Sequence, residues 1–200
     1  MNKLLGLGAL LTGAAAAYLI IAPSPIDPVA WEAPPMPLMS GALEPNDTLM
    51  KAELIGKGAI HGPEDTAVDA EGRLYASLHN GQVVRFASDG QPAVFADTQG
   101  RPLGMDFDRQ GNLIVADAYK GLLSINPQGQ IRVLSTSADG VPFAFTDDLD
   151  IASDGRIYFS DASDKFQQPD YLLDLLEARA HGRLLRYDPA TNSTEVLLKD

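Results

Sequence analysis

Short runs of alternating apolar and polar residues fill most of the chain from residue 64 onward, and most end at a Gly-containing turn. Alternation with a period of two over four to eight residues predicts half-buried β-strands, and pairs such as Asn80-Gly81 predict tight hairpin turns. The pattern predicts three units of four strands each. The strands fall near 64–70, 73–78, 82–87 and 92–96, near 104–108, 112–117, 121–125 and 130–134, and near 148–152, 156–161, 183–188 and 194–198.

The three units are repeats of one another. Their equivalent turn glycines, Gly72, Gly111 and Gly155, are 39 and 44 residues apart. A period near forty residues built from short strands is typical of β-propeller blades. The sequence therefore predicts an all-β fold in which residues 46–200 supply about three blades, near 64–96, 104–134 and 148–198. Because propellers have four to eight blades, we expect a partial propeller from a longer protein rather than a ring completed by another chain.

The third unit carries an insertion between its second and third strands. Gly182 follows the anchoring Gly155 by 27 residues, whereas the matching separations in the other units are 9 and 10. The extra residues near 169–180 begin with Pro169 and continue through good helix formers, which predicts a short helix. Two interpretations stay open for this helix: a lid over the channel mouth, or a helix packed on the rim.

The N-terminus is apolar and uncharged over the 19 residues Leu4–Ala22. At a rise of 1.5 Å per residue, this length comes close to the roughly 30 Å hydrocarbon core of a bilayer. Residues 1–22 are therefore predicted to form a transmembrane helix that is a signal anchor or a signal peptide. The anchor is favoured because Pro23 would directly follow a cut after Ala22.

The distribution of positive charge predicts the orientation of that segment. Lys3 precedes the apolar run, and the first Lys or Arg after it is Lys51. By the positive-inside rule we expect a single-pass membrane protein with a cytoplasmic N-terminus and an exported propeller, in the periplasm or another extracytoplasmic space. Secretion after signal cleavage is the alternative. Residues 23–45 are predicted to form a Pro-rich linker. Six prolines fall within the fifteen residues 23–37, which predicts a stiff, extended spacer without helix there.

Composition excludes several functions. The formal net charge is −12, so the surface repels phosphate, and we expect no nucleic-acid partner. There is no cysteine, which excludes disulfides and thiolate chemistry. The sequence contains no Gly-x-Ser-x-Gly elbow, P-loop or dinucleotide fingerprint. The three histidines, His61, His79 and His181, lie beside glycines in predicted turns, and we interpret them as surface loop residues.

Aligning the repeats places acidic residues at equivalent positions. Glu64 and Asp147 each precede their turn glycine by eight residues, and each begins the innermost strand of its unit. The second unit has Leu103 at this position. The next residue is also acidic in the first and third units. The four acids that should face the central axis are Glu64, Asp65, Asp147 and Asp148.

Converging carboxylates repel one another, and burying them unpaired is costly. A hard dication removes this repulsion, and Ca²⁺ prefers six to eight oxygen ligands in a loose shell. Without Cys or His at these positions, zinc and copper are disfavoured. The four acids are therefore candidate Ca²⁺ ligands. The alternative is that they cap strands or form Asx turns.

Two stretches resemble a known superfamily. They are the run Ala116-Asp117-Ala118-Tyr119-Lys120-Gly121-Leu122 and the repeat segment from Asp148 to Asp161. Both resemble the strictosidine synthase-like branch of the superfamily that includes strictosidine synthase, senescence marker protein/gluconolactonase and paraoxonase. Within that branch the likeness is greatest to adipocyte plasma membrane-associated proteins. The resemblance implies a six-bladed propeller and an N-terminal anchor with an exported domain.

The resemblance also implies roles for individual residues. Glu64 matches the glutamate that holds the catalytic Ca²⁺ of gluconolactonases and paraoxonases, and Asp65 matches an acid that serves a second, structural Ca²⁺. Asp147 falls at the position of a Ca²⁺-binding asparagine, and Asp148 matches the acid that follows it. Leu103 and Asp117 occupy the positions of the paraoxonase histidine pair, so that acid–base machinery is missing and the catalytic residues stay unassigned.

Three functions follow as hypotheses. The first is a membrane-anchored, exported, Ca²⁺-dependent hydrolase that acts on a small-molecule ester or lactone. The second is a non-catalytic propeller that binds a small molecule or a protein. The third, a strictosidine synthase-like lyase, is the least favoured, because family membership does not fix the chemistry.

Overall fold

Three four-stranded antiparallel sheets make up the body of the protein. The computed structural model describes residues 12–19 and 21–199, and within each sheet the strands follow chain order. Sheet one comprises β1 (Pro63–Val68), β2 (Leu74–Leu78), β3 (Gln82–Phe86) and β4 (Pro92–Asp97). Sheet two comprises β5 (Pro102–Phe107), β6 (Leu113–Asp117), β7 (Gly121–Ile125) and β8 (Ile131–Ser135). Sheet three comprises β11 (Thr146–Ile151), β12 (Ile157–Asp161), β13 (Arg183–Asp188) and β14 (Ser193–Lys199).

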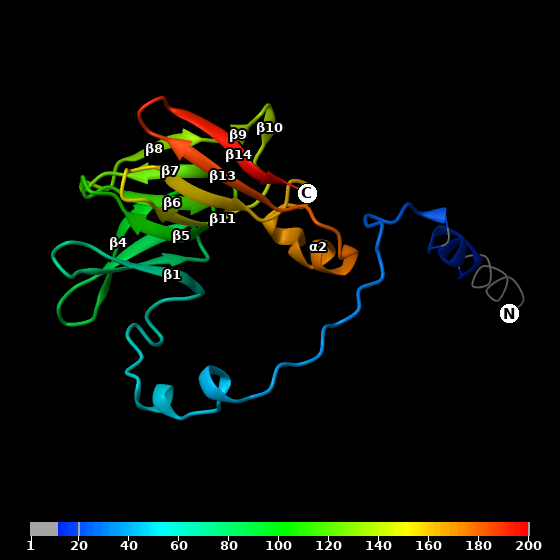
Figure 1. Ribbon diagram of the computed structural model, residues 1–200, viewed down its shortest axis with the longest axis horizontal. Coiled ribbons are helices and arrows are strands. Elements are labelled where there is room, and N and C mark those ends of the chain that lie inside the picture. Colours follow the sequence, from blue (N-terminus) through cyan, green and yellow to red (C-terminus); the bar gives the residue numbers. More distant parts are fainter. Residues whose placement is uncertain (1–11, 20, 200) are drawn as a thin grey trace, which may run out of the picture.

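The sheets stack as successive blades, with sheet two in the middle (Figure 1). The innermost strand β5 contacts β1 on one side and β11 on the other. This arrangement confirms the predicted all-β, propeller-type fold. The first residues of β1, β5 and β11 therefore lie at one end of the stack.

Asp-x-x-Gly turns explain why the strands end where they do. Asp69 Oδ1 accepts hydrogen bonds from the backbone amides of Glu71 and Arg73, at 3.1 and 2.8 Å. Asp108 does the same in sheet two. The glycine that completes the first turn, Gly72, has φ of 79°, a conformation that other residues adopt at a cost. Sequence and backbone geometry thus agree at these turns.

A small hairpin after β8 was not predicted. It consists of β9 (Ser137–Ala138) and β10 (Val141–Pro142), joined by Asp139 and Gly140. Both turn residues have positive φ, 51° and 78°, as a tight two-residue hairpin turn requires. Strands of two residues are too short for an alternating pattern to reveal them.

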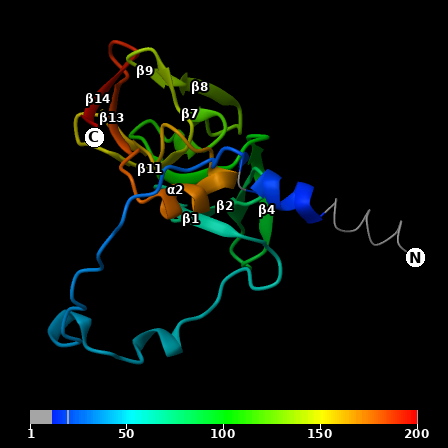
Figure 2. The same ribbon diagram turned by 90° about the vertical axis from the view of Figure 1, so that its right-hand side faces the viewer.

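The inserted segment forms η3 (Gln168–Asp170) and α2 (Tyr171–Glu177). The helix ends earlier than the predicted limit near residue 180, because Ala178 adopts a left-handed conformation with φ of 53°. Figures 1 and 2 place α2 at one end of the sheets, beside the N-terminal part of the chain.

The N-terminal part is helical over residues 12–19 and mostly extended from residue 22 to the first sheet. Two single-turn 3₁₀ helices interrupt it, η1 (Gly41–Leu43) and η2 (Thr48–Lys51). Both lie after the proline-rich stretch 23–37, which contains no helix. Across residues 12–19 and 21–199, no helix combines the length and apolarity needed to cross a bilayer. Twelve residues of the predicted transmembrane segment 1–22, namely 1–11 and 20, lie outside these described residues.

Two apolar clusters hold the sheets together. Between sheets one and two, Tyr75 makes edge-to-face contacts with Phe95 and Phe107, each at 5.1 Å between ring centroids. Between sheets two and three, the fully buried Phe159 and Tyr187 pack with residues of β6 and β7. Burial of large side chains between layers is the main favourable contribution to folding here.

We predict that Phe159→Ala lowers the free energy of unfolding by about 3–5 kcal/mol, because it leaves a cavity between sheets two and three. Val94→Ala is the control, since Val94 lies exposed on β4, and it should change stability by less than about 0.5 kcal/mol. Urea denaturation measures both. Equal losses in the two variants would contradict the assignment of the core.

Candidate site at the first residues of the innermost strands

All four predicted site residues lie in β-bulges. The pairing of β1 with β2 shifts register between Pro63 and Thr66, and β11 shifts likewise between Thr146 and Leu149. β5 has the same irregularity at the equivalent position. A bulge re-aims side chains and is frequent beside functional sites. The repeated bulge therefore turns the side chains of residues 64–65 and 147–148 differently from those of a regular strand.

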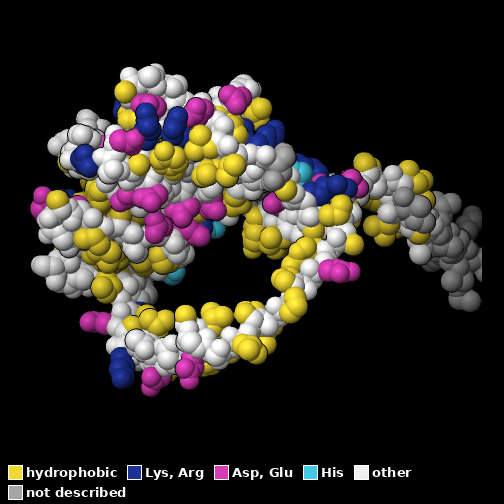
Figure 3. Space-filling model, viewed as in Figure 1, with side chains coloured by type: hydrophobic (Ala, Val, Ile, Leu, Met, Phe, Trp, Pro, Cys, Tyr) yellow, Lys and Arg dark blue, Asp and Glu magenta, His cyan; other side chains and the backbone are white. Residues whose placement is uncertain are grey.

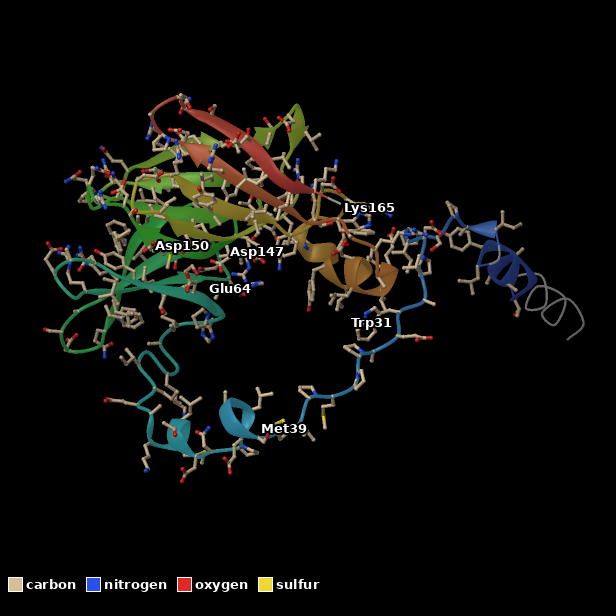
Figure 4. All side chains as sticks on the ribbon, viewed as in Figure 1. Trp31, Met39, Glu64, Asp147, Asp150 and Lys165 are labelled. Carbon is tan, nitrogen blue, oxygen red and sulfur yellow. The ribbon has the colours of Figure 1, made fainter. Side chains whose placement is uncertain are left out.

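Glu64 and Asp147 come together from different sheets. Figure 4 shows them at the same end of β1 and β11, with Asp150 further along β11. Burial raises the pKa of the Asp147 carboxyl above its ordinary value, and the neighbouring carboxylates of Asp148 and Glu64 raise it further. Figure 3 shows acidic side chains gathered over these innermost strands. Negative charge is thus concentrated at the end of the sheets where the predicted Ca²⁺ ligands lie.

Arg101 is a site residue that the sequence reasoning missed. Its guanidinium Nη2 donates to Glu64 Oε2 at 2.9 Å; the Arg101 side chain is 8% exposed and that of Glu64 49%. The other guanidinium nitrogens, Nε and Nη1, are buried and have no hydrogen-bond partner in the described residues. Comparison of the repeats could have identified Arg101. The equivalent positions in the other two units carry the uncharged residues Gly62 and Phe145, so the arginine is specific to the second unit.

Asp65 forms a link between two sheets. Its Oδ1 accepts from the amide of Thr66 and its Oδ2 from the amide of Met105, both at 2.7 Å. The amide of Asp65 donates to Ser77 Oγ, which in turn donates to the carbonyl of Leu103 at 2.8 Å. Both carboxylate oxygens therefore accept hydrogen bonds from backbone amides. This matches the alternative prediction from the sequence, in which the acids cap strands.

Asp148 is also engaged by the backbone and packs closely against sheet two. Its Oδ1 accepts from the amide of Leu149 at 2.8 Å. A side chain at Gly104 would collide with it, since an added Cβ would meet Asp148 Oδ1 and lie 2.7 Å from its Cα. Glycine in β5 thus allows the close approach of β11.

The two residues at the positions of the paraoxonase histidine pair are structural. Leu103 is buried at 3% exposure. Asp117 is fully buried, and its Oδ1 accepts from the amides of Arg101, Tyr119 and Lys120 at 2.9–3.0 Å. Asp117 therefore fixes the turn that carries Arg101.

His61 and His79 lie near the start of β1, where the amide of His79 donates to the carbonyl of Gly62 at 3.0 Å. His61 and His79 are exposed, as expected for surface loops. The same expectation for His181 was wrong. Its ring lies beside the Phe166 ring, and Nε2 is 3.4 Å from Glu177 Oε1, so the insertion largely covers it.

The four predicted ligands do not form one closed metal cage. Within residues 12–19 and 21–199, no three His, Asp or Glu side chains are grouped closely enough to hold an ion. Asp65 has both oxygens on backbone amides, whereas Glu64 Oε1 and the Asp147 carboxylate have no such contact in the hydrogen bonds described above. The hard oxygen donors of Glu64 and Asp147 fit two positions of a Ca²⁺ shell. The remaining positions would need other ligands.

Comparisons with known proteins agree with this architecture. The family model described as "Strictosidine synthase-like, N-terminal" matches residues 41–86, and that described as "Strictosidine synthase" matches residues 147–200. Strictosidine synthase-like 4 of Arabidopsis thaliana is 43% identical, over 76% of this chain and 43% of its own length. The adipocyte plasma membrane-associated protein of Homo sapiens is 39% identical, over 90% of this chain and 47% of its own length.

This chain spans about half the length of the curated relatives it matches. Among solved structures, a gluconolactonase from Xanthomonas campestris superposes with a TM-score of 0.59 and 22% identity, over 70% of this chain and 48% of that chain. A putative gluconolactonase gives a TM-score of 0.57 and 19% identity, over 70% and 50%. These two likenesses support the fold.

We predict that Gly104→Ala lowers the free energy of unfolding by about 1–3 kcal/mol, because β5 and β11 must separate to admit the methyl group. Gly182→Ala is the matched control, since a Cβ there would lie 3.6 Å from its nearest neighbour, an ordinary contact. Thermal denaturation monitored by circular dichroism compares the two. If the control loses as much stability as Gly104→Ala, the close packing at Asp148 is not the cause.

Proposed function

The chain belongs to the strictosidine synthase-like family, and on that premise we propose that it is part of a Ca²⁺-dependent hydrolase of small-molecule esters or lactones. The parent fold is proposed to be a six-bladed propeller, with the reaction at the end of the channel where Glu64 and Asp147 lie. The relatives named as plasma membrane-associated support a membrane location. We propose a single N-terminal span with its N-terminus in the cytoplasm and the propeller exported.

One observation carries the catalytic proposal: two carboxylates from bulges in different sheets converge, and the pKa of one of them is raised. Repulsion of this kind destabilises the fold unless a cation or a proton compensates for it. The solved gluconolactonase structures share the fold, which supports a hydrolytic reading of the same end of the channel.

The residues of this chain would have separate roles in the proposed reaction. Glu64 and Asp147 would hold Ca²⁺, which when bound polarises an ester carbonyl and stabilises the negative charge that develops on its oxygen. Arg101 orients Glu64 by taking up Oε2 and leaves Oε1 directed elsewhere. Asp65 fixes the spacing of β1 and β5 through the amide of Met105. Asp117 Oδ1 is committed to three amides, whereas its buried Oδ2 has no hydrogen-bond partner among the described residues. The group that transfers the proton is left unassigned.

A second candidate is a non-catalytic propeller that binds a small molecule. The observation that favours it is the Glu64–Arg101 ion pair, which already supplies a positive charge to one candidate ligand. In this case Glu64 would stay paired with Arg101, and the channel would bind its ligand without turnover.

Calorimetry with Ca²⁺, alongside assays with phenyl acetate and a simple lactone, tests the proposal on the full-length protein. We predict micromolar binding and metal-dependent hydrolysis. Glu64→Gln and Asp147→Ala should each weaken Ca²⁺ binding by at least about 10-fold, because each removes one carboxylate ligand from a shell that depends on ligand charge. Asp147→Ala should not lower the unfolding temperature. Glu64→Gln should lower it modestly, because it neutralises the partner of the buried Arg101 guanidinium.

Asp65→Ala provides the structural contrast. It removes the acceptor for the amide of Met105, so we expect it to lower the free energy of unfolding by about 1–3 kcal/mol. A wild-type protein that binds a ligand but neither Ca²⁺ nor an ester would support the second candidate. If Asp65→Ala leaves stability unchanged while Glu64→Gln unfolds the protein, the assigned roles are reversed.

A further inference from the structure

The inserted helix α2 has its polar side toward the protein and its apolar side toward solvent. Leu172, Leu175 and Leu176 are 56–68% exposed, and Tyr171 is 46% exposed. The residue of α2 that is fully buried is Glu177, at 1%. A surface helix normally shows the opposite arrangement. Four large apolar side chains on two turns of helix therefore form an exposed patch, here called the α2 face (Tyr171, Leu172, Leu175 and Leu176).

Ionic contacts hold α2 in this orientation. Lys165 Nζ donates to both oxygens of Glu177 at 2.6 Å, which is the main reason that the pKa of this carboxyl lies below its ordinary value. Ser163 Oγ donates to Asp174 Oδ1 at 3.1 Å. These contacts hold the polar side of α2 against the protein. The exposure of the α2 face therefore follows from how the helix is anchored and not from a loosely held helix.

The N-terminal part of the chain is clamped to the same insertion. Arg179 donates to the carbonyl of Asp27 through Nε at 2.6 Å and to its carboxylate through Nη2 at 2.7 Å. The amide of Val29 donates to the carbonyl of Glu177 at 3.0 Å. Figures 1 and 2 both show this stretch running beside α2.

This clamp limits how far α2 can lie from the apolar N-terminal segment. Asp27 follows Ala22, the last residue of the apolar run, by five positions. A fully extended chain of that length spans at most about 18 Å. Trp31 lies just beyond the clamp and is 71% exposed. Tryptophan favours the interface between lipid and water.

We propose that the α2 face and Trp31 together rest on the surface of a lipid bilayer with neutral headgroups. The four side chains of the face are uncharged and expose apolar area of the kind that interfacial helices bury at the acyl boundary. Neutral lipid is specified because the chain has a net charge of −12, which anionic headgroups would repel. The proposal rests on the membrane location proposed above for the N-terminal segment.

The consequence concerns access to the candidate site. α2 lies at the same end of the sheets as Glu64 and Asp147 (Figure 4). Contact between the α2 face and the bilayer would bring this end of the channel close to the membrane surface. Substrates that partition into lipid would then reach the site directly.

These 200 residues contain no cysteine, so once any cysteine elsewhere in the full-length protein is replaced by serine, one introduced cysteine can be labelled alone. Leu175→Cys and Ser88→Cys, each in the full-length protein, are labelled with the environment-sensitive dye NBD. Ser88 is exposed in the turn between β3 and β4, in a different sheet from α2. On adding phosphatidylcholine vesicles, the label at position 175 should at least double in emission and shift to the blue, and the label at position 88 should not change.

A second readout is intrinsic. Trp31 is the single tryptophan of these 200 residues. The difference in quenching by brominated phosphatidylcholine between the full-length protein and its Trp31→Phe variant therefore reports the depth of Trp31. Replacing Leu172 and Leu176 together by serine in the protein labelled at position 175 should reduce the lipid-induced rise in emission of that label by at least about twofold, because the face no longer enters the lipid surface. The unfolding temperature should not fall, since these side chains are not part of the core. Adding phosphatidylserine should not strengthen binding.

Three results would overturn the proposal. If the protein binds vesicles but the label at position 175 stays in water, the N-terminal segment alone makes the contact and the membrane location still holds. If the protein does not bind vesicles at all, both proposals fail. If the label at position 175 is already blue-shifted without lipid, the α2 face is covered by protein; concentration dependence of that shift would identify a second copy as the cover.

Discussion

The carboxylate of Asp65 connects the first two sheets at the end of the molecule where the candidate site lies. It accepts one amide from its own strand and one from β5, and its own amide continues through Ser77 to the carbonyl of Leu103. A buried amide that loses its partner costs free energy, so this bridge fixes the spacing of the two innermost strands. The separation of Glu64 from Arg101 depends on it, and so does the placement of β11 over Gly104.

The same bulge thus serves two purposes at consecutive residues. One acid of each pair is bound by backbone amides, as Asp65 and Asp148 show, and the other is directed toward its counterpart in a different sheet. Under the proposed function, the residue that stabilises the strand and the residue that would bind the cation are adjacent in sequence. The buried guanidinium of Arg101 also has a role other than stability. A buried charge with two nitrogens that lack partners contributes little to folding, so we interpret Arg101 as the residue that positions Glu64.

Much of the fold followed from the sequence, because the alternation of apolar residues and the Asp-x-x-Gly turns are local signals. The strand pattern and the inserted helix are of this kind. The hairpin at Asp139-Gly140 was too short to leave such a signal. Repeat alignment predicted that the four acids lie at one end of the sheets and left open that they cap strands, as Asp65 and Asp148 do through backbone amides. Metal binding by these acids stays a prediction. Arg101 was missed because its pairing with Glu64 links residues 37 positions apart, and the burial of His181 depends on the tertiary packing of the insertion.

The central claim is that Glu64 and Asp147 provide oxygen ligands for a divalent cation. A crystal structure of the full-length protein grown with millimolar Ca²⁺ tests it most directly. We expect an ion within about 2.3–2.6 Å of carboxylate oxygens of both residues, with Arg101 still donating to Glu64 Oε2. A structure in which both carboxylates lack an ion at that concentration, with Glu64 held by Arg101 alone, would contradict the claim.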